Sequence, residues 1–228
     1  SKKHLLFELQ ISSDKWNISH INNKESSADF FIVNENIIEK DNFFLLATAH
    51  EVQKLINNGD KLIDLNNFTN TIPSYRANLQ VFNSRGGFSS YQSEYPFSMT
   101  TKKGNILSPV SSLLNKSADI NIIFFKNIFQ LPIQEKFSIF FINIKTKKIL
   151  KKERVITNFL NEIIVDSSLI EPDIFIFSEK YIGVPIFCSI KNNYISLEHT
   201  HPPHEYIISD NKFKVVSQLK REFNEIIN

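Results

Sequence analysis

The chain has 228 residues, of which 42% are hydrophobic and 22% charged, and its formal net charge is +2. These values are ordinary for a globular protein, and the length predicts one domain over residues 1–228 that needs no disulfide or metal to hold its core. The near-balanced charge provides no basic field that would favour nucleic acid or a membrane surface, and no run approaches the ~18 apolar residues of a membrane span.

The first half of the chain carries five strand patterns and one strong helix signal. Strands are predicted at residues 5–11, 29–33, 43–47, 61–65 and 75–82. After the third of these, Thr48 and Glu51 form a capping box, in which each side chain bonds a free amide at the start of a helix. Gly59 stands where the left-handed residue that ends a helix belongs, so the helix is expected to stop there.

The second half combines further strands with two more helices. Strands are predicted at residues 120–125, 137–144, 174–177, 184–190 and 194–198. Residues 191–193, Lys-Asn-Asn, suit a hairpin turn because Asn tolerates positive φ. Apolar residues at helical spacing predict a helix over residues 152–165 and another after Asp210, a candidate N-cap.

These elements predict an α+β fold: a single domain with a mainly antiparallel sheet and about three packing helices. If residues 137–177 form a strand, a helix and a parallel strand, the sheet is mixed. The single cysteine, Cys188, lies in an apolar run, which predicts a buried thiol. Because the N-terminus has a strand pattern and no leader pattern, we expect a cytoplasmic protein.

A cluster near the C-terminus holds three of the six histidines, within residues 199–205, His-Thr-His-Pro-Pro-His-Glu. If residues 194–201 form a strand, His199 and His201 share a face with the apolar residues before them. The two prolines end strand pairing and stiffen the chain, so that His204 and Glu205 follow on a rigid corner. Histidine changes charge near neutral pH and is a common metal ligand, so the cluster is a candidate site.

Three interpretations of this histidine cluster are open. In the first, it binds zinc or iron and leaves one coordination position free. The ligands are then His199, His201 and His204, with Glu205 as the alternative third. In the second, one histidine transfers a proton and a carboxylate, Glu198 or Glu205, orients it. In the third, the histidines have a structural role and hydrogen-bond to backbone at strand ends.

The sequence of residues 198–202, Glu-His-Thr-His-Pro, is similar to the acid-x-x-His-Pro ending of SGNH-type serine hydrolases. The resemblance implies a serine hydrolase in which His201 is the base and Glu198 orients it. The serines considered as nucleophiles are Ser84, Ser89, Ser90 and Ser108.

A second candidate region spans residues 84–105, which show no helical or strand periodicity. It is longer than the ~12–15 residues usual for a structureless loop, and such long loops are often functional. It also concentrates scarce residue types, because three of the five glycines lie in it. The alternative is a long hairpin or flap whose aromatic side chains cover the sheet.

The residue types at the start of this region suit a polar ligand. Gly86 and Gly87 can present consecutive amides to an anion. Arg85 adds a forked charge that matches phosphate or carboxylate, and Arg76 lies just upstream. Neutral hydrogen bonds, of the kind a sugar requires, would come from Ser89 and Tyr91.

The sequence therefore predicts a small soluble enzyme acting on a polar, anionic or sugar-like small molecule through the histidine cluster. Whether the chemistry is acid/base or metal-assisted stays open, and the prediction requires Arg85 and the histidines to meet in space. The competing prediction is a non-catalytic ligand-binding or assembly protein with structural histidines. In either case the partner is a small molecule, with no nucleic acid and no membrane.

Overall fold

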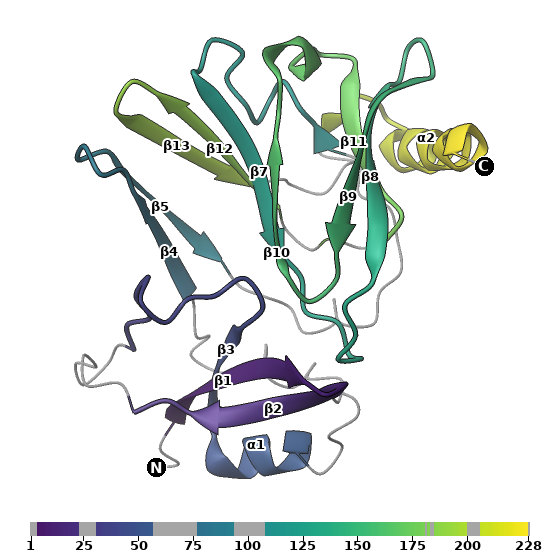
Figure 1. The fold of residues 1–228 in the computed structure, drawn as a ribbon. Helices are drawn as coiled ribbons and strands as arrows, with labels where there is room; N and C mark the ends of the chain where they lie inside the picture. Colours follow the sequence, from purple (N-terminus) through teal and green to yellow (C-terminus); the bar gives the residue numbers. More distant parts are fainter. Residues whose placement is uncertain are drawn as a thin grey trace.

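Figure 1 shows the fold in a computed structural model of the chain. The structure describes residues 4–22, 31–56, 77–93, 108–180, 182, 185–199 and 206–227.

The N-terminal part is a three-stranded antiparallel sheet followed by one helix. Its strands are β1 (His4–Ser12), β2 (Lys15–His20) and β3 (Phe43–Thr48) in the order β2-β1-β3, and α1 (Ala49–Ile56) follows β3 directly. The predicted capping box is confirmed, because Glu51 Oε2 accepts hydrogen bonds from the Thr48 amide at 2.7 Å and the Thr48 hydroxyl at 2.8 Å. This part has a hydrophobic core of its own, made by Phe7, Leu9, Trp16, Leu45, Ala47, Val52 and Leu55.

Two four-stranded antiparallel sheets pack face to face in the larger part of the molecule (Figure 1). The first sheet has the order β10-β7-β12-β13, with β7 (Ile120–Lys126), β10 (Leu160–Ile164), β12 (Ile186–Lys191) and β13 (Tyr194–His199). The second has the order β6-β11-β8-β9, with β6 (Ser108–Pro109), β8 (Lys136–Asn143), β9 (Lys148–Ile156) and β11 (Ile174–Ser178). A short 3₁₀ turn, Ser167–Leu169, precedes β11. Alternate residues of both sheets point inward and share one core, including Ile123, Phe125, Ile163, Phe187, Phe137, Ile139, Phe141 and Ile176.

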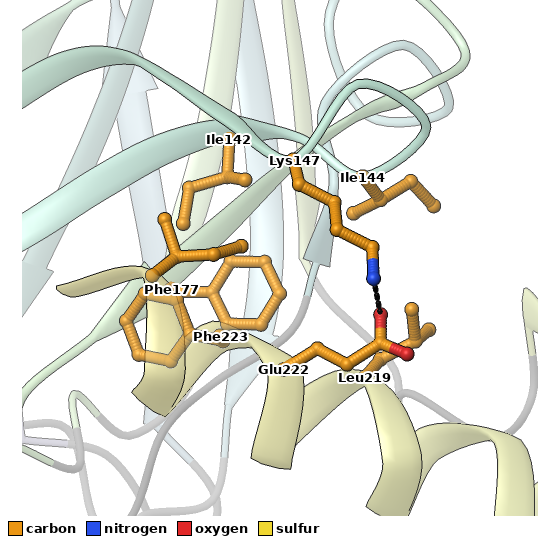
Figure 2. Close-up of a pocket in the computed structure, with 8 residues that line it drawn as sticks. Ile142, Ile144, Lys147, Phe177, Leu219, Glu222 and Phe223 are labelled. Atoms are coloured by element: carbon orange, nitrogen blue, oxygen red, sulfur yellow. Dashed lines mark ion pairs between the residues drawn. The ribbon is translucent and has the colours of Figure 1, made fainter. Parts of the chain in front are cut away.

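The outer face of the second sheet is covered by α2 (Lys212–Ile227). Phe223 of α2 stacks on Phe177 at 4.1 Å between ring centroids and meets the edge of Phe140 at 5.7 Å. Figure 2 shows this packing, with an ion pair between Lys147 and Glu222 at its rim. The predicted C-terminal helix is therefore confirmed, although it begins at Lys212 and not directly after Asp210.

The N-terminal sheet is attached to the sandwich by hydrogen bonds and by apolar packing. Trp16 Nε1 donates to the Gln130 carbonyl at 2.9 Å, and the Leu160 amide of β10 donates to the Lys40 carbonyl at 2.6 Å. Ile128, just after β7, packs against the N-terminal core. The two hydrophobic cores are thus joined along the end of the first sheet.

A separate hairpin consists of β4 (Ala77–Phe82) and β5 (Phe88–Ser93), paired antiparallel. The strand predicted at residues 75–82 is confirmed from residue 77 onward. β5 lies next to β13, the edge strand of the first sheet (Figure 1).

The predicted helix over residues 152–165 is wrong, and the predicted α+β class with about three packing helices is corrected to a mainly β fold. The end of β9, a tight turn and β10 occupy this segment, which crosses from the second sheet to the first. Asn158 makes the turn possible with a φ of +53°. Among the described residues α1 and α2 are the only α-helices and every strand pairing is antiparallel, so neither the mixed sheet nor the parallel crossover is formed.

The remaining strand predictions have mixed outcomes. The strand predicted at residues 29–33 is wrong where it is described, since residues 31–33 belong to no strand, and β1 pairs instead with β2. The hairpin turn at residues 191–193 is confirmed, with Asn192 at a φ of +54°. Residues 61–65 and Gly59 lie outside the described residues. Neither helix in the described part of the chain has the length and apolar character needed to cross a membrane.

Candidate functional site

The end of β13 carries the described part of the histidine cluster. Ile195, Leu197 and His199 are half-buried while the residues between them are exposed, so they share one face as predicted. His199 pairs with Ile186 of β12, so its backbone is held in the sheet. The other predicted site residues of the cluster, His201, His204 and Glu205, lie outside the described residues.

His199 and Glu198 are in direct contact. Glu198 Oε1 accepts a hydrogen bond from the His199 amide at 3.0 Å and lies 3.2 Å from His199 Nδ1. One carboxylate oxygen thus touches both the backbone and the ring of the next residue. This contact can fix the orientation and tautomer of the imidazole, which is what an acid/base pair requires.

The described residues do not form a metal centre by themselves. Within the described ranges, no group of three His, Cys, Asp or Glu side chains is arranged to hold a metal ion. Of the predicted ligands, His199 is described and His201 and His204 are not. The zinc or iron hypothesis therefore stays a prediction.

The tip of the β4–β5 hairpin contains the first residues of the second candidate region. The Asn83 amide donates to the Gly87 carbonyl at 2.7 Å, and the Gly86 amide donates to the Asn83 carbonyl at 2.9 Å. Gly86 has a φ of +95°, and the Arg85 amide donates to Asn83 Oδ1 at 3.0 Å. The Gly86 amide closes the turn and the Arg85 side chain is exposed at the tip, and the prediction that Gly86 and Gly87 present amides to an anion stays a prediction.

Gly87 brings this tip against the turn between β12 and β13. A β-carbon at Gly87 would overlap the carbonyl oxygen of Asn193 and lie 3.0 Å from its carbon. The Asn193 turn is itself held in place, because the Asn192 amide donates to Asp119 Oδ2 at 2.7 Å. Two hairpins that are far apart in sequence thus meet main chain to main chain at a position that admits no side chain.

Three exposed aromatic residues lie close in sequence to the contact between Gly87 and Asn193. Phe88 follows Gly87 and is 52% exposed, and Tyr194 follows Asn193 and is 79% exposed. Phe82, 69% exposed, packs on Phe88 with 5.2 Å between ring centroids. Phe82 and Tyr194 were not predicted as site residues, although the sequence contains one signal: Phe82 breaks the apolar–polar alternation of its strand.

The described parts of the two candidate regions lie at opposite ends of β13. Gly87 is next to Asn193, just before the strand begins, and His199 is its last residue. At about 3.3 Å per residue, the backbone distance between these ends is about 20 Å. Arg85 and His199 therefore belong to separate candidate sites. Of the other predicted ligand-binding residues, Ser89 and Tyr91 belong to β5. Arg76 lies outside the described residues.

Cys188 of β12 is buried, as predicted, and burial raises the pKa of its thiol. This favours the neutral thiol, so Cys188 is a packing residue of the first sheet. No family model, no curated protein and no solved structure matches the chain, so the functional argument rests on the geometry described above.

Proposed function

We propose that the chain is a ligand-binding module that holds an anionic, sugar-like small molecule where the tips of the β4–β5 and β12–β13 hairpins meet. The observation that carries the proposal is the contact of Gly87 with the Asn193 carbonyl, because it gathers exposed side chains from both hairpins onto a fixed framework. Of the two predictions from sequence, this corresponds to the non-catalytic binding protein.

The side chains around this contact have complementary roles for such a ligand. The Arg85 guanidinium presents a planar fork that suits a carboxylate or a phosphate. Phe82, Phe88 and Tyr194 are exposed, and aromatic faces pack on the apolar face of a sugar ring. Ser89, on β5, adds a neutral hydroxyl two residues after Gly87.

Titration by NMR and calorimetry tests the proposal, with D-glucuronate and D-glucose 6-phosphate as probes and D-glucose as the uncharged comparison. We expect dissociation constants in the millimolar range for the two anions, about 4 kcal/mol of binding free energy, and weaker binding of glucose. Amide signals of residues 84–89 and 193–194 should shift. A lack of binding by both anions, or shifts confined to other parts of the chain, would overturn the proposal.

Two pairs of variants separate the site from general surface effects. Arg85→Ala should weaken binding of the anions by about tenfold, whereas Arg154→Ala, also an exposed arginine, should leave it unchanged. Phe88→Ala should weaken binding of every sugar that binds. Phe213→Ala is its control, because Phe213 is an aromatic residue of α2 that is 63% exposed.

The contact between Glu198 and His199 favours a second candidate function, an acid/base site at the other end of β13. This candidate includes the serine-hydrolase and the metal-assisted alternatives. It predicts turnover of p-nitrophenyl esters, or labelling of one serine by a fluorophosphonate, and loss of that activity in His199→Ala. His50→Ala, on the exposed side of α1, is the control. Zinc titration, read on His199 ring signals, tests the metal alternative.

We also propose a cytoplasmic location, which suits a chain whose single cysteine is a buried free thiol.

A further inference from the structure

The two hairpins that meet at Gly87 and Asn193 carry the same order of side-chain types. Residues 85–88 of the first hairpin are Arg-Gly-Gly-Phe, and residues 191–194 of the second are Lys-Asn-Asn-Tyr. Each hairpin therefore has a cation two residues before the contact and an aromatic residue directly after it. The second cation, Lys191, is a charged group at this contact that the proposed ligand site does not yet include.

Lys191 is exposed, and its ammonium contacts a neutral group. It pairs with Tyr194 across the closing turn of the hairpin, so the two β-carbons lie about 4.5–5.5 Å apart. Its Nζ donates to Ser117 Oγ at 3.2 Å, which leaves two of the three N–H donors for a ligand. Neither Lys191 nor Arg85 forms an ion pair in the part of the chain that the structure describes.

The other charged groups at this turn already have partners. The Asp119 carboxylate accepts the Asn192 amide at 2.7 Å, so one of its oxygens serves the turn itself. Lys116, next to Ser117 in sequence, forms an ion pair with Glu171. Lys191 is therefore the lysine at this turn whose charge can bind an anion without first leaving a carboxylate.

The aromatic residues at the two tips form an open surface, because more than half of each side chain is exposed at Phe82, Phe88 and Tyr194. A ligand on such a surface is contacted from one side, whereas a pocket surrounds most of a small ligand. A single sugar unit therefore gains little binding energy here. A ligand that contacts both hairpins gains more, because its second contact is intramolecular.

We propose that the ligand of this site is an acidic oligosaccharide of two or more sugar units that contacts both hairpins. One unit places its carboxylate on Arg85 and its ring on Phe88, and another places its carboxylate on Lys191 and its ring on Tyr194. Each cation is two residues from the contact, so its Cα lies within ~7 Å of Gly87 or Asn193. The inference rests on the proposed function, because it concerns the same site, and it adds Lys191 as a residue that selects for ligand length.

Titration of the whole chain by calorimetry and NMR, with α-1,4-linked tri-D-galacturonate and with methyl α-D-galacturonoside as the single unit, tests the inference. We expect the trimer to bind at least ~10-fold more tightly, since three equivalent units alone give only about a threefold statistical gain. If the single unit binds and the trimer gains threefold or less, the extended ligand is overturned while the proposed function stands. If neither binds, both fail.

Two lysine variants at the same turn locate the second contact. Lys191→Ala should weaken binding of the trimer at least ~5-fold and change binding of the single unit by no more than about twofold, because Arg85 still holds one unit. Lys116→Ala is the matched control, since this lysine is also exposed but is paired with Glu171, and it should change neither affinity. Equal losses in the two variants would show a general charge effect and overturn the role of Lys191.

A six-nucleotide oligothymidylate tests the other extended polyanion that this surface could bind, since exposed aromatic rings also stack on bases. The formal net charge of +2 provides little of the phosphate attraction on which nucleic-acid binding depends, so we expect the trigalacturonate to bind more tightly. Tighter binding of the oligothymidylate, with the same loss in Lys191→Ala, would overturn the assignment to a sugar.

Discussion

The carbonyl oxygen of Asn193 lies where a β-carbon at Gly87 would have to stand. Neither residue is informative alone, since each belongs to an ordinary hairpin turn. Their contact joins the two hairpins just before β5 and β13, which begin at the exposed residues Phe88 and Tyr194. The proposed ligand site depends on this single approach of two backbones.

Gly87→Ala tests that approach directly. The added methyl group must displace one of the hairpins, so we expect a loss of about 1–3 kcal/mol in the free energy of unfolding and shifted amide signals at Asn193 and Tyr194. Gly86→Ala is the matched control, because no atom lies within 4 Å of the added carbon. Its φ of +95° costs ~1 kcal/mol locally but leaves the Asn193 signals in place. Unperturbed signals in Gly87→Ala would contradict the contact.

The packing of α2 on the second sheet depends chiefly on Phe223. Its ring is fully buried against Phe177 and Phe140, so Phe223→Ala should reduce the free energy of unfolding by about 3–5 kcal/mol in urea titration. Phe213→Ala, on the same helix but 63% exposed, should change it by no more than about 0.5 kcal/mol. Similar losses in the two variants would show that α2 is not anchored at Phe223.

Most strands of the two large sheets and both described helices follow from local patterns, but β2, β5 and the segment of residues 152–165 do not. Val155, Phe159 and Ile163 repeat every four residues, which fits a helix and equally fits two strands of period two. In the structure Val155 and Ile163 point into the shared core from different sheets. The distinguishing signal was Asn158, whose side chain favours a turn, together with the β-branched residues around it.

The candidate ligand site could be predicted only in part. The unusual composition around Arg85 and Gly87 selected one hairpin tip, because scarce residue types stand out locally. Its partner, the turn at Asn193, is more than a hundred residues away, and no local pattern encodes such a contact. The same limit applies to the expected meeting of Arg85 with the histidines, because the length of β13 separates Arg85 from His199, the described member of the cluster.

Asn158 stabilises the turn between β9 and β10, which stands where a helix was expected. Its buried side chain accepts from the Phe129 amide at 2.6 Å and donates to the Leu131 and Ile133 carbonyls at 2.9 and 3.0 Å. Asn158→Ala removes all three bonds and leaves the Phe129 amide without its partner, whereas the Leu131 and Ile133 carbonyls still accept from the Ile133 amide and the Thr157 hydroxyl. The variant should cost about 2–3 kcal/mol of unfolding free energy. Asn158→Gly should cost ~1–2 kcal/mol less than the alanine variant, because glycine tolerates the positive φ. Thermal or urea unfolding measures both, and the reverse order would refute the strain argument.

Lys126 makes the free energy of unfolding depend on pH in the alkaline range. Burial lowers its pKa to about 8 in the folded chain, from 10.5 when unfolded, so between these values the unfolded chain holds a proton that the folded chain has released. The free energy of unfolding therefore rises with pH across this window, and the full penalty of the buried charge applies below it. Because the amine keeps some solvent contact, we expect a rise of about 1–2 kcal/mol. Lys126→Met loses the hydrogen bonds of Nζ to the Glu39 carbonyl and Asn42 Oδ1 at every pH, but its free energy of unfolding should not rise across this window. The difference in unfolding free energy between the variant and the original protein must therefore change from pH 7.5 to pH 10. Parallel profiles would mean that the amine is not buried as the structure has it.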